Sequence, residues 1–333
     1  MKKLWLVLSA LSLAVIGAAC VHSFSSTVRT DFAMFWNADK IAYPPPYLFF
    51  VKPFGALPYG WAFLAWLVAT GALYFAATPS PKSAAFANPA AAYNGLIGQN
   101  GFLTSGILFA GLRDLAAHPA RAGAILGLLI VKPQLALALP IVVVSGGYWR
   151  AIPGALATTV TMIAAALLVF GPQAYIRFFE EAGFYTHLLD TGGWGWAEVA
   201  SVFGFARWCG ASLATAWAFQ IAAALAAAAA VWHAWRRDIE GKIALASAAT
   251  LLISPYLFTY DATLLTFALA VLTGWRAVVL WLLAALPLVR VFVHWDWPNT
   301  VPAAAAFAVA TILLESVQER RKTQEPAPAG SAS

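Results

Sequence analysis

Uncharged apolar segments recur along the whole chain, and several are about as long as a bilayer is thick. Leu4–Phe24, Pro153–Phe170 and Ala211–Trp235 lie close to or above the roughly 20 apolar residues that a membrane-spanning helix needs. Residues of the AVILMFWYC set make up 62% of the 333 residues, and only 10% are charged, against about 25% in soluble domains. So few charges cannot cover a soluble surface, which excludes a soluble enzyme, a disordered chain and a nucleic-acid-binding protein.

We therefore expect an all-α polytopic membrane protein with about 10–12 transmembrane segments, some of them short or broken. Short or proline-broken segments are tolerated at membrane depth where they line a cavity. Residues 1–317 are expected to form one transmembrane domain, and residues 318–333 a disordered cytoplasmic tail. The other expected segments are Trp61–Thr78, Ala84–Ile97, Phe102–Leu112, Ala122–Val131, Gln134–Ser145, Ile243–Pro255, Thr263–Thr273, Ala277–Val293 and Val301–Leu314.

Basic residues predict which side each connection faces. Lys2 and Lys3 before an apolar run resemble a signal peptide, but the rest of the chain is membrane-bound, so we interpret Leu4–Phe24 as a retained helix. With both termini in the cytoplasm, the long connections 25–60 and 171–210 face the outside of a plasma (inner) membrane. Thirteen of the 20 basic residues then fall inside, as the positive-inside rule requires: Lys2, Lys3, Lys82, Arg113, Arg121, Arg150, Arg236, Arg237, Lys242, Arg276, Arg320, Arg321 and Lys322.

The first outer connection holds two carboxylates among aromatic residues. Asp31 and Asp39 lie eight residues apart, a little over two helical turns, so a helix would place both on one face. A carboxylate in apolar surroundings has a raised pKa, which suits a general base. Asp31 is therefore a candidate catalytic residue. The alternative is that Asp31 caps a short helix, with Phe32 and Phe35 buried behind it.

Two polar interruptions give further candidates. Lys132 and Pro133 interrupt an apolar stretch of about 24 residues, and a lysine in such a stretch indicates a function by default. We expect Lys132 at an outer hairpin tip, where it binds phosphate as a point charge or extends its amine to the membrane surface. Gln99 and Asn100, which are flanked by glycines, either hydrogen-bond a sugar or satisfy a tight turn.

Aromatic and charged residues gather again towards the C-terminus. Tyr260 and Asp261 follow a proline-broken span on the expected outer side. Asp261 has three candidate partners, Lys132, Arg290 and Lys52, and the sequence leaves the choice open. Arg290 itself precedes another aromatic cluster, so we count it as a candidate substrate-binding residue.

The second outer connection carries Trp194-Gly195-Trp196, whose ring faces suit sugars or lipid headgroups, although the membrane-interface belt is the commoner use. The five histidines show no HExxH spacing, and Walker, GxGxxG and GxSxG motifs are missing from the sequence. We expect no cofactor. A divalent metal would find only Asp31 and Asp39 as an acidic pair, and nothing else in the pattern indicates one.

Taken in chain order, the motifs resemble glycosyltransferase family 87 over about residues 25–275. The most specific pieces are Gly-Gln-Asn-Gly and Lys-Pro-Gln at their spacing. The series comprises Asp31-Phe32 with Trp36, Tyr43-Pro44-Pro45-Pro46, Gly98-Gln99-Asn100-Gly101-Phe102-Leu103-Thr104, Arg121-Ala122-Gly123, Lys132-Pro133-Gln134-Leu135, Trp149-Arg150, and Ser254-Pro255-Tyr256 followed by Tyr260-Asp261.

The resemblance implies a GT-C helical bundle with its active site on the outer, periplasmic face. It implies transfer of a hexose, often mannose, from a polyprenyl-phosphate sugar to a lipid or glycan acceptor. In the family an Asp of the first outer loop is the base, and Asp31 holds the matching position. From the residue patterns we expect substrate-binding residues around it: Lys132, Gln99, Asn100, Asp261, Tyr260 and Arg290. The expected partners are donor, acceptor and membrane lipids, and no nucleic acid.

Two alternatives stay open. A transporter or flippase would also use broken helices and intramembrane charge, although the charges gather on one face and no inverted repeat is visible. A catalytically inactive relative is the other alternative, because the stretch between the Asp-Phe and Pro-Pro-Pro motifs is shorter than the family usually has. Asp39 and Tyr43 are only four residues apart.

Overall fold

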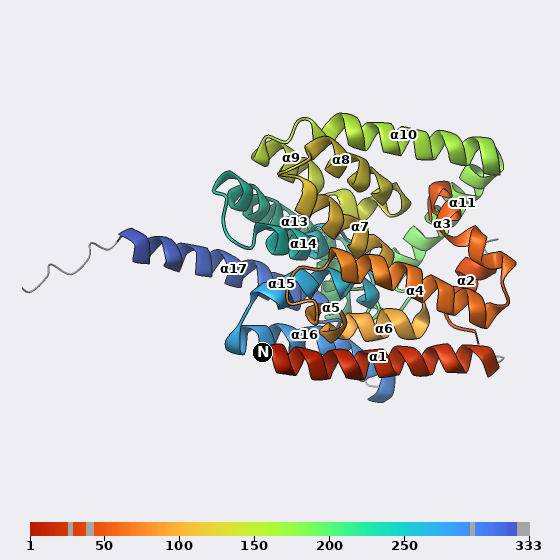
Figure 1. The fold of residues 1–333 in the computed structure, drawn as a ribbon, viewed down its shortest axis with the longest axis horizontal. Coiled ribbons are helices and arrows are strands. Elements are labelled where there is room, and N and C mark those ends of the chain that lie inside the picture. The colour runs from red at the N-terminus through yellow and green to blue at the C-terminus, as the bar shows by residue number, and fades with distance from the viewer. Residues whose placement is uncertain (26–28, 38–42, 294–296, 325–333) are drawn as a thin grey trace, which may run out of the picture.

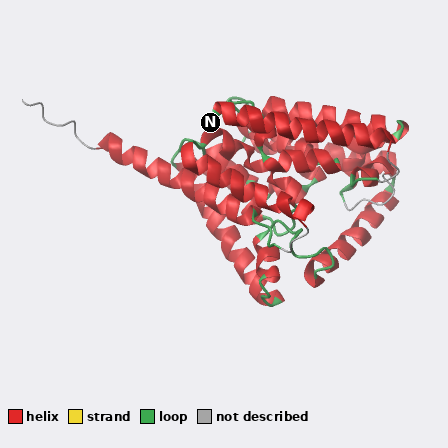
Figure 2. Ribbon diagram, turned by 90° about the horizontal axis from the view of Figure 1, so that it is seen from below, coloured by secondary structure: helices red, strands yellow, loops and turns green. Residues whose placement is uncertain are grey.

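The computed structural model describes residues 1–25, 29–37, 43–293 and 297–324, and this part of the chain is helices and connecting loops (Figures 1 and 2). Val199 and Phe258 of this part of the chain form an isolated antiparallel β-bridge. The helices are α1 (Lys2–Ser25), α2 (Phe32–Asn37), η1 (Pro45–Tyr47), α3 (Leu48–Val51), η2 (Lys52–Ala56), α4 (Tyr59–Ala77), α5 (Ala84–Ala87), α6 (Pro89–Ile97), α7 (Gly101–Asp114), α8 (Pro119–Gly127), η3 (Leu128–Val131), η4 (Pro133–Ala136), α9 (Leu139–Gly146), α10 (Ala151–Phe170), α11 (Pro172–Thr191), α12 (Val202–Trp208), α13 (Leu213–Arg236), α14 (Lys242–Ile253), η5 (Thr259–Leu265), α15 (Thr266–Val271), α16 (Gly274–Val293) and α17 (Val301–Gln324).

Within the described residues, five helices are long and apolar enough to cross a membrane: α1, α4, α10, α13 and the Val301–Gln318 part of α17. Five further apolar segments of 10–17 residues accompany them, which agrees with the expected short or broken spans. On α10 the large side chains Leu156, Val160 and Leu168 are exposed, as suits a surface that faces hydrocarbon rather than water. The expected all-α polytopic membrane fold is confirmed.

Connections between helices gather at two ends of the molecule. One end holds the N-terminus and the last turns of α17 (Figure 1). There Arg113 and Lys82 both donate hydrogen bonds to carbonyls at the end of α4, and Arg276 pairs with Glu315 at 2.8 Å. These three basic residues belong to the set that the sequence assigns to the cytoplasm. The other end carries α2, α3 and α11 (Figure 1).

The chain folds into a hairpin around Lys132. α8 and η3 lead up to Lys132, and η4 and α9 lead away from it. The arms, residues 119–131 and 133–146, each reach about 20 Å at 1.5 Å per residue, less than the roughly 30 Å of a hydrocarbon core. Lys132 is only 2% exposed. Its amine therefore ends inside the protein instead of extending to the membrane surface.

Small residues let this hairpin lie directly on α10. A Cβ on Gly127 would meet the carbonyl oxygen of Ala155 at 2.6 Å, and a Cβ on Gly123 or Gly154 would meet backbone carbonyl oxygens even more closely. Gly123 and Gly127 stand four residues apart, the spacing by which small residues bring membrane helices together. The contact fixes the hairpin, and with it Lys132, against the bundle.

One expected span is divided. Segment Ala84–Ile97 breaks at Asn88, whose side chain caps α6 by accepting a hydrogen bond from Ala90 and donates another to the Ala262 carbonyl at 2.9 Å. At 9 residues, α6 is about 14 Å long and cannot cross a bilayer alone. It ends instead at a turn, Gly98 to Asn100, from which the largely buried α7 continues.

Two regions that the sequence predicts as a connection and as a disordered tail contain helices. The connection 171–210 contains α11 and α12. At the C-terminus α17 continues to Gln324, so residues 318–324 of the expected tail are helical. Residues 325–333 lie outside the described part of the chain.

Candidate active site

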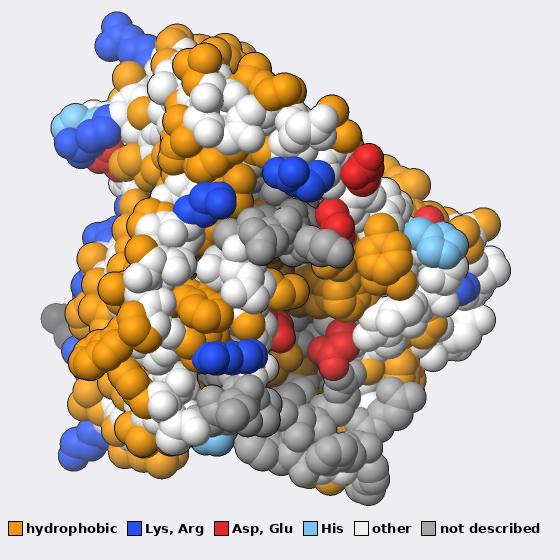
Figure 3. Space-filling model, turned by 90° about the vertical axis from the view of Figure 1, so that its right-hand side faces the viewer, with side chains coloured by type: hydrophobic (Ala, Val, Ile, Leu, Met, Phe, Trp, Pro, Cys, Tyr) orange, Lys and Arg blue, Asp and Glu red, His pale blue; other side chains and the backbone are white. Residues whose placement is uncertain are grey.

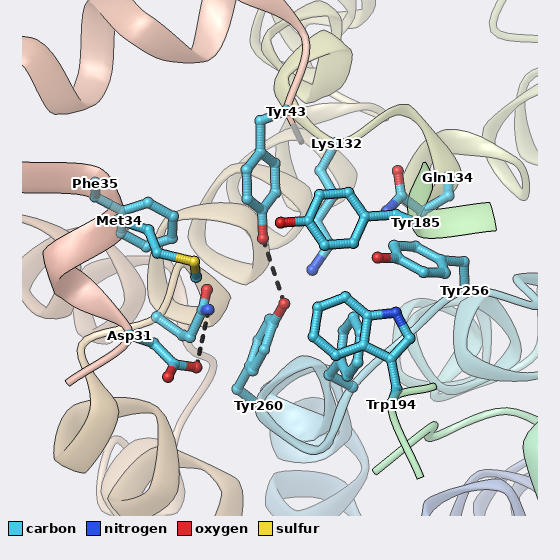
Figure 4. Close-up of a pocket in the computed structure, with 12 residues that line it drawn as sticks. Asp31, Met34, Phe35, Tyr43, Lys132, Gln134, Tyr185, Trp194, Tyr256 and Tyr260 are labelled. Atoms are coloured by element: carbon cyan, nitrogen blue, oxygen red, sulfur yellow. Dashed lines mark hydrogen bonds between the residues drawn. The ribbon is translucent and has the colours of Figure 1, made fainter. Parts of the chain in front are cut away.

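A pocket opens at the end of the molecule that carries α2, α3 and α11. Figure 3 shows this end, where acidic and basic side chains surround a hollow with hydrophobic side chains inside it. The pocket holds about 650 Å³ of space, its open mouth included. Its described lining is Asp31, Met34, Phe35, Tyr43, Gln99, Lys132, Gln134, Tyr185, Trp194, Tyr256, Phe258 and Tyr260 (Figure 4). Four residues singled out in the sequence, Asp31, Gln99, Lys132 and Tyr260, thus meet in one place.

Asp31 lies directly before α2 and lines the pocket. Its Oδ2 accepts a hydrogen bond from Gln99 Nε2 at 3.3 Å. The residue keeps solvent access, yet the surrounding protein buries its carboxyl enough to raise the pKa, while the Gln99 hydrogen bond lowers it. Phe32 and Phe35, both 0% exposed, pack behind it and anchor α2. A carboxylate of raised pKa that faces open space can accept a proton from a ligand.

The turn after α6 holds Gln99 beside Asp31. Gly98 has a φ of +72°, and a Cβ there would lie 2.6 Å from the Phe63 ring. A Cβ on Gly101 would lie 2.5 Å from the carbonyl oxygen of Tyr260. Both glycines are therefore required, one by its left-handed backbone and both by close packing. The turn brings the Gln99 amide to the pocket, and it has no room for a side chain at Gly98 or Gly101.

Asp261 is the partner of Lys132 that the sequence left open. Lys132 Nζ lies 2.5 Å from Asp261 Oδ1, and the two side chains are 2% and 0% exposed. Asn100 Oδ1 accepts a longer hydrogen bond from the same amine, at 3.5 Å. The second Asp261 oxygen, Oδ2, accepts from the Phe258 backbone N–H at 3.0 Å. Both carboxylate oxygens are thus occupied within the protein, so Asp261 supports Lys132 from behind the pocket lining.

Tyr260 forms the floor beside Lys132. The Lys132 amine lies 4.6 Å from the centre of the Tyr260 ring, a cation–π contact. The Tyr260 hydroxyl lies 3.3 Å from that of Tyr43, as the dashed line in Figure 4 shows. Tyr43 comes from the start of the Pro-rich segment, where Pro45 and Pro46 open η1. The stiff segment therefore delivers a hydroxyl to the pocket.

Four aromatic residues of the lining form what we call the aromatic wall: Tyr185, Trp194, Tyr256 and Phe258. Tyr185, Trp194 and Tyr256 lie on the side of the pocket away from Asp31 (Figure 4). Trp194 stacks on Tyr185 with ring centres 5.2 Å apart and an angle of 9°. Phe258 meets Trp194 edge-on at 5.6 Å. The sequence pattern singles out the ring faces of Trp194 and includes Tyr256 in a motif, but it predicts no sugar contact for Tyr185, Tyr256 or Phe258, because aromatic residues are also common at membrane interfaces.

The pocket also contains residues that the sequence did not indicate, and two expected residues lie outside the described part of the structure. Met34 and Gln134 line the pocket and were not anticipated, although Gln134 belongs to the Lys-Pro-Gln motif. Arg290 lies in α16, but its side chain is outside the described part of the structure, as is all of Asp39. Among the residues that the structure describes, no group of three or more His, Cys, Asp or Glu side chains is placed to hold a metal ion.

Comparison with known proteins gives a family. The sequence model of glycosyltransferase family 87 matches residues 41–255, more than half of the chain. The matched range includes Gln99, Lys132 and Trp194, but it begins after Asp31 and ends before Tyr260. It is thus narrower than the range over which the motifs resemble the family. Neither a curated protein nor a solved structure matches the chain.

Proposed function

The chain belongs to glycosyltransferase family 87, and from this we propose that it moves a hexose, with mannose favoured, from a polyprenyl-phosphate sugar to a lipid or glycan acceptor. Its family and its apolar helices make it a multi-pass membrane glycosyltransferase. The observation that carries the finer proposal is the pocket in which Asp31, Gln99 and Lys132 come together. A base and a buried cation in one pocket suit a reaction that deprotonates an alcohol and releases a phosphate.

In the proposed reaction Asp31 is the general base. The acceptor hydroxyl gives its proton to the Asp31 carboxylate while its oxygen bonds to the anomeric carbon of the donor. The bond from that carbon to the phosphate oxygen breaks, the electron pair leaves with polyprenyl phosphate, and the configuration inverts. The Gln99 hydrogen bond at 3.3 Å orients the carboxylate for this step.

Lys132 is proposed to bind the donor phosphate. Its ammonium has three N–H donors; Asp261 and Asn100 accept two of them. Because Asp261 already balances the charge of Lys132, the amine acts on phosphate as a hydrogen-bond donor more than as a net positive charge. Tyr260 and Tyr43, whose hydroxyls lie 3.3 Å apart, are further donors for the same oxygens.

An apolar groove beside the Lys132 hairpin is proposed to take the polyprenyl chain. It runs between the hairpin and α10, and its lining includes Leu126, Ile130, Pro133, Leu139 and Leu156. Pro133 lines this groove and directly follows Lys132, and the proposal places the phosphate of a lipid in the groove near the amine. Hydrocarbon in such a groove replaces membrane lipid without exposing apolar surface to water.

The proposed orientation follows from the two ends of the bundle. The end with Lys82, Arg113 and Arg276 would face the cytoplasm, together with both termini, by the positive-inside rule. The pocket at the opposite end would then face the outside of a plasma (inner) membrane. A donor presented on that face would reach the pocket from the lipid side.

The test is a transfer assay in liposomes. Purified protein is supplied with a panel of polyprenyl-phosphate sugars and total membrane lipid of the host, beside Asp31→Ala. A sugar-bearing product made by wild type alone would support the proposal and identify the donor. Transport of a donor across sealed vesicles without a product would favour a flippase. A folded protein that neither transfers nor transports would be an inactive relative.

A further inference from the structure

We infer that the aromatic wall is a carbohydrate subsite, against which the pyranose ring of a bound sugar packs. The inference rests on the proposed function, in which the donor, and a glycan acceptor too, carries such a ring. It adds a binding role for Tyr185, Trp194, Tyr256 and Phe258, none of which takes part in the proton transfer or the phosphate contact.

The wall offers both kinds of contact that a sugar needs. A pyranose has apolar C–H faces and polar hydroxyls around its edge. Tyr and Trp combine a broad apolar ring with a polar N–H or O–H group, and Trp194, Tyr185 and Tyr256 all reach the pocket (Figure 4). Pockets for small molecules have this composition, with aromatic faces and a few placed polar groups.

One atom of the wall points to a polar ligand. The indole N–H of Trp194 is buried and has no hydrogen-bond partner among the described residues. Buried donors in folded proteins nearly always have a partner, since leaving one unpaired is unfavourable. A sugar hydroxyl can accept this hydrogen bond once a small rotation of the indole exposes the N–H. An isoprenoid chain has no acceptor, so it would leave the N–H unpaired and is the weaker candidate for this surface.

The wall is held in place by its own small core. Trp194 and Tyr256 pack on a cluster formed by Leu189, Val199, Phe203, Ala206 and Ala216. The Ala200 N–H donates to the Leu257 carbonyl at 2.8 Å. The side-chain amide of Asn299, just before α17, donates to Thr259 Oγ1 at 3.0 Å. Thr259 directly follows Phe258 in the chain. A surface fixed in this way is ready before the ligand arrives, which lowers the entropy lost on binding.

Binding is tested first without any transfer. Asp31→Asn protein in detergent is titrated with methyl glucopyranoside, galactopyranoside and mannopyranoside, and separately with farnesyl phosphate, with saturation-transfer NMR as the readout. Trp194→Leu removes ring and N–H, and Trp194→Phe keeps a ring alone. Trp149→Leu is the matched control, because Trp149 is 57% exposed and does not line the pocket.

We expect Trp194→Leu to weaken the affinity for at least one methyl glycoside about tenfold, Trp194→Phe to weaken it less, and Trp149→Leu to leave it unchanged. Unchanged glycoside binding in Trp194→Leu would overturn the subsite. So would a loss confined to farnesyl phosphate, which would make the wall an isoprenoid surface. Absence of any glycoside binding to the parent protein would overturn it as well.

Kinetics then identify which sugar the wall holds. With Asp31 intact, a raised KM for the donor in Trp194→Leu would place the donor sugar on the wall, and a raised KM for the acceptor would place the acceptor sugar there. The carbohydrate subsite and the proposed transfer reaction can be disproved independently of each other. Glycoside binding that depends on Trp194, in a wild-type protein that transfers no sugar, would keep the subsite and remove the proposed reaction.

Discussion

Lys132 and Asp261 form an ion pair at 2.5 Å, although 129 residues separate them in the chain. Both side chains are almost completely buried, so each depends on the other for charge compensation. The pair joins the hairpin tip to η5, and η5 carries Tyr260 into the pocket.

Asp261→Asn is expected to destabilise the protein more than the double variant Asp261→Asn with Lys132→Met. Breaking one partner of a buried pair typically lowers the free energy of unfolding by about 3–5 kcal/mol, because a charge is left uncompensated. The double variant removes that charge and should recover much of the loss. The unfolding temperatures of wild type, Asp261→Asn, Lys132→Met and the double variant are measured in one detergent. Additive effects of the two single changes would contradict the coupling.

Asp31→Asn and Asp31→Ala are expected to lower the rate of sugar transfer by at least about 10²-fold, the range for a positioned general base. Because Asp31 keeps solvent access and is not part of the core, both variants should unfold at the wild-type temperature. Glu180→Gln is the control, since Glu180 is an exposed carboxylate on nearby α11 that does not line the pocket. Wild-type turnover by Asp31→Asn would remove Asp31 as the base.

The pH–rate profile should show an acidic limb set by Asp31. The base works when deprotonated, so the rate rises with pH through its pKa, which burial raises and the Gln99 hydrogen bond lowers. Gln99→Leu removes only the lowering contribution, so the limb should move to higher pH. Rates for Gln99→Leu and for Gln173→Leu, an exposed glutamine on α11, are compared across pH. A limb that stays in place, or moves to lower pH, would argue against this assignment.

Gly98→Ala should be more harmful than Gly147→Ala. The two glycines have nearly equal φ angles, +72° and +73°, so alanine meets the same backbone strain, about 1–2 kcal/mol, at both. Only at Gly98 does the new Cβ also meet Phe63 and Phe32, whereas a Cβ on Gly147 meets no side chain or distant backbone within 4 Å. The displaced turn should also carry Gln99 away from Asp31 and slow transfer. Equal unfolding temperatures for the two variants would show that the close packing is unimportant.

The membrane fold could be predicted because apolar segments of about 20 residues have few other uses. Lys132 could be singled out for a similar reason, since a charge inside an apolar stretch is unfavourable unless something pairs with it. Its partner could not be chosen, because Asp261 lies 129 residues away and sequence spacing says nothing about contacts at that distance.

The aromatic wall shows where sequence reasoning stops. The sequence around a tryptophan that lines a pocket resembles the sequence around one that lies at a membrane interface, so the sequence alone does not distinguish them. Tyr185 of α11 and Tyr256 of the segment before η5 line the same pocket although they are far apart in the chain. The break at Asn88 was missed because Asn88 is satisfied by Ala262, a residue of a distant segment.

The separation of Lys132 from Asp261 also has a consequence for biosynthesis. At about 5–20 residues per second, a ribosome advances the 129 positions from Lys132 to Asp261 in roughly 6–26 s. Throughout that interval the counter-charge that Lys132 has in the folded protein has not yet been synthesised. The pocket end of the molecule therefore cannot be completed until the segment that contains Asp261 has been made.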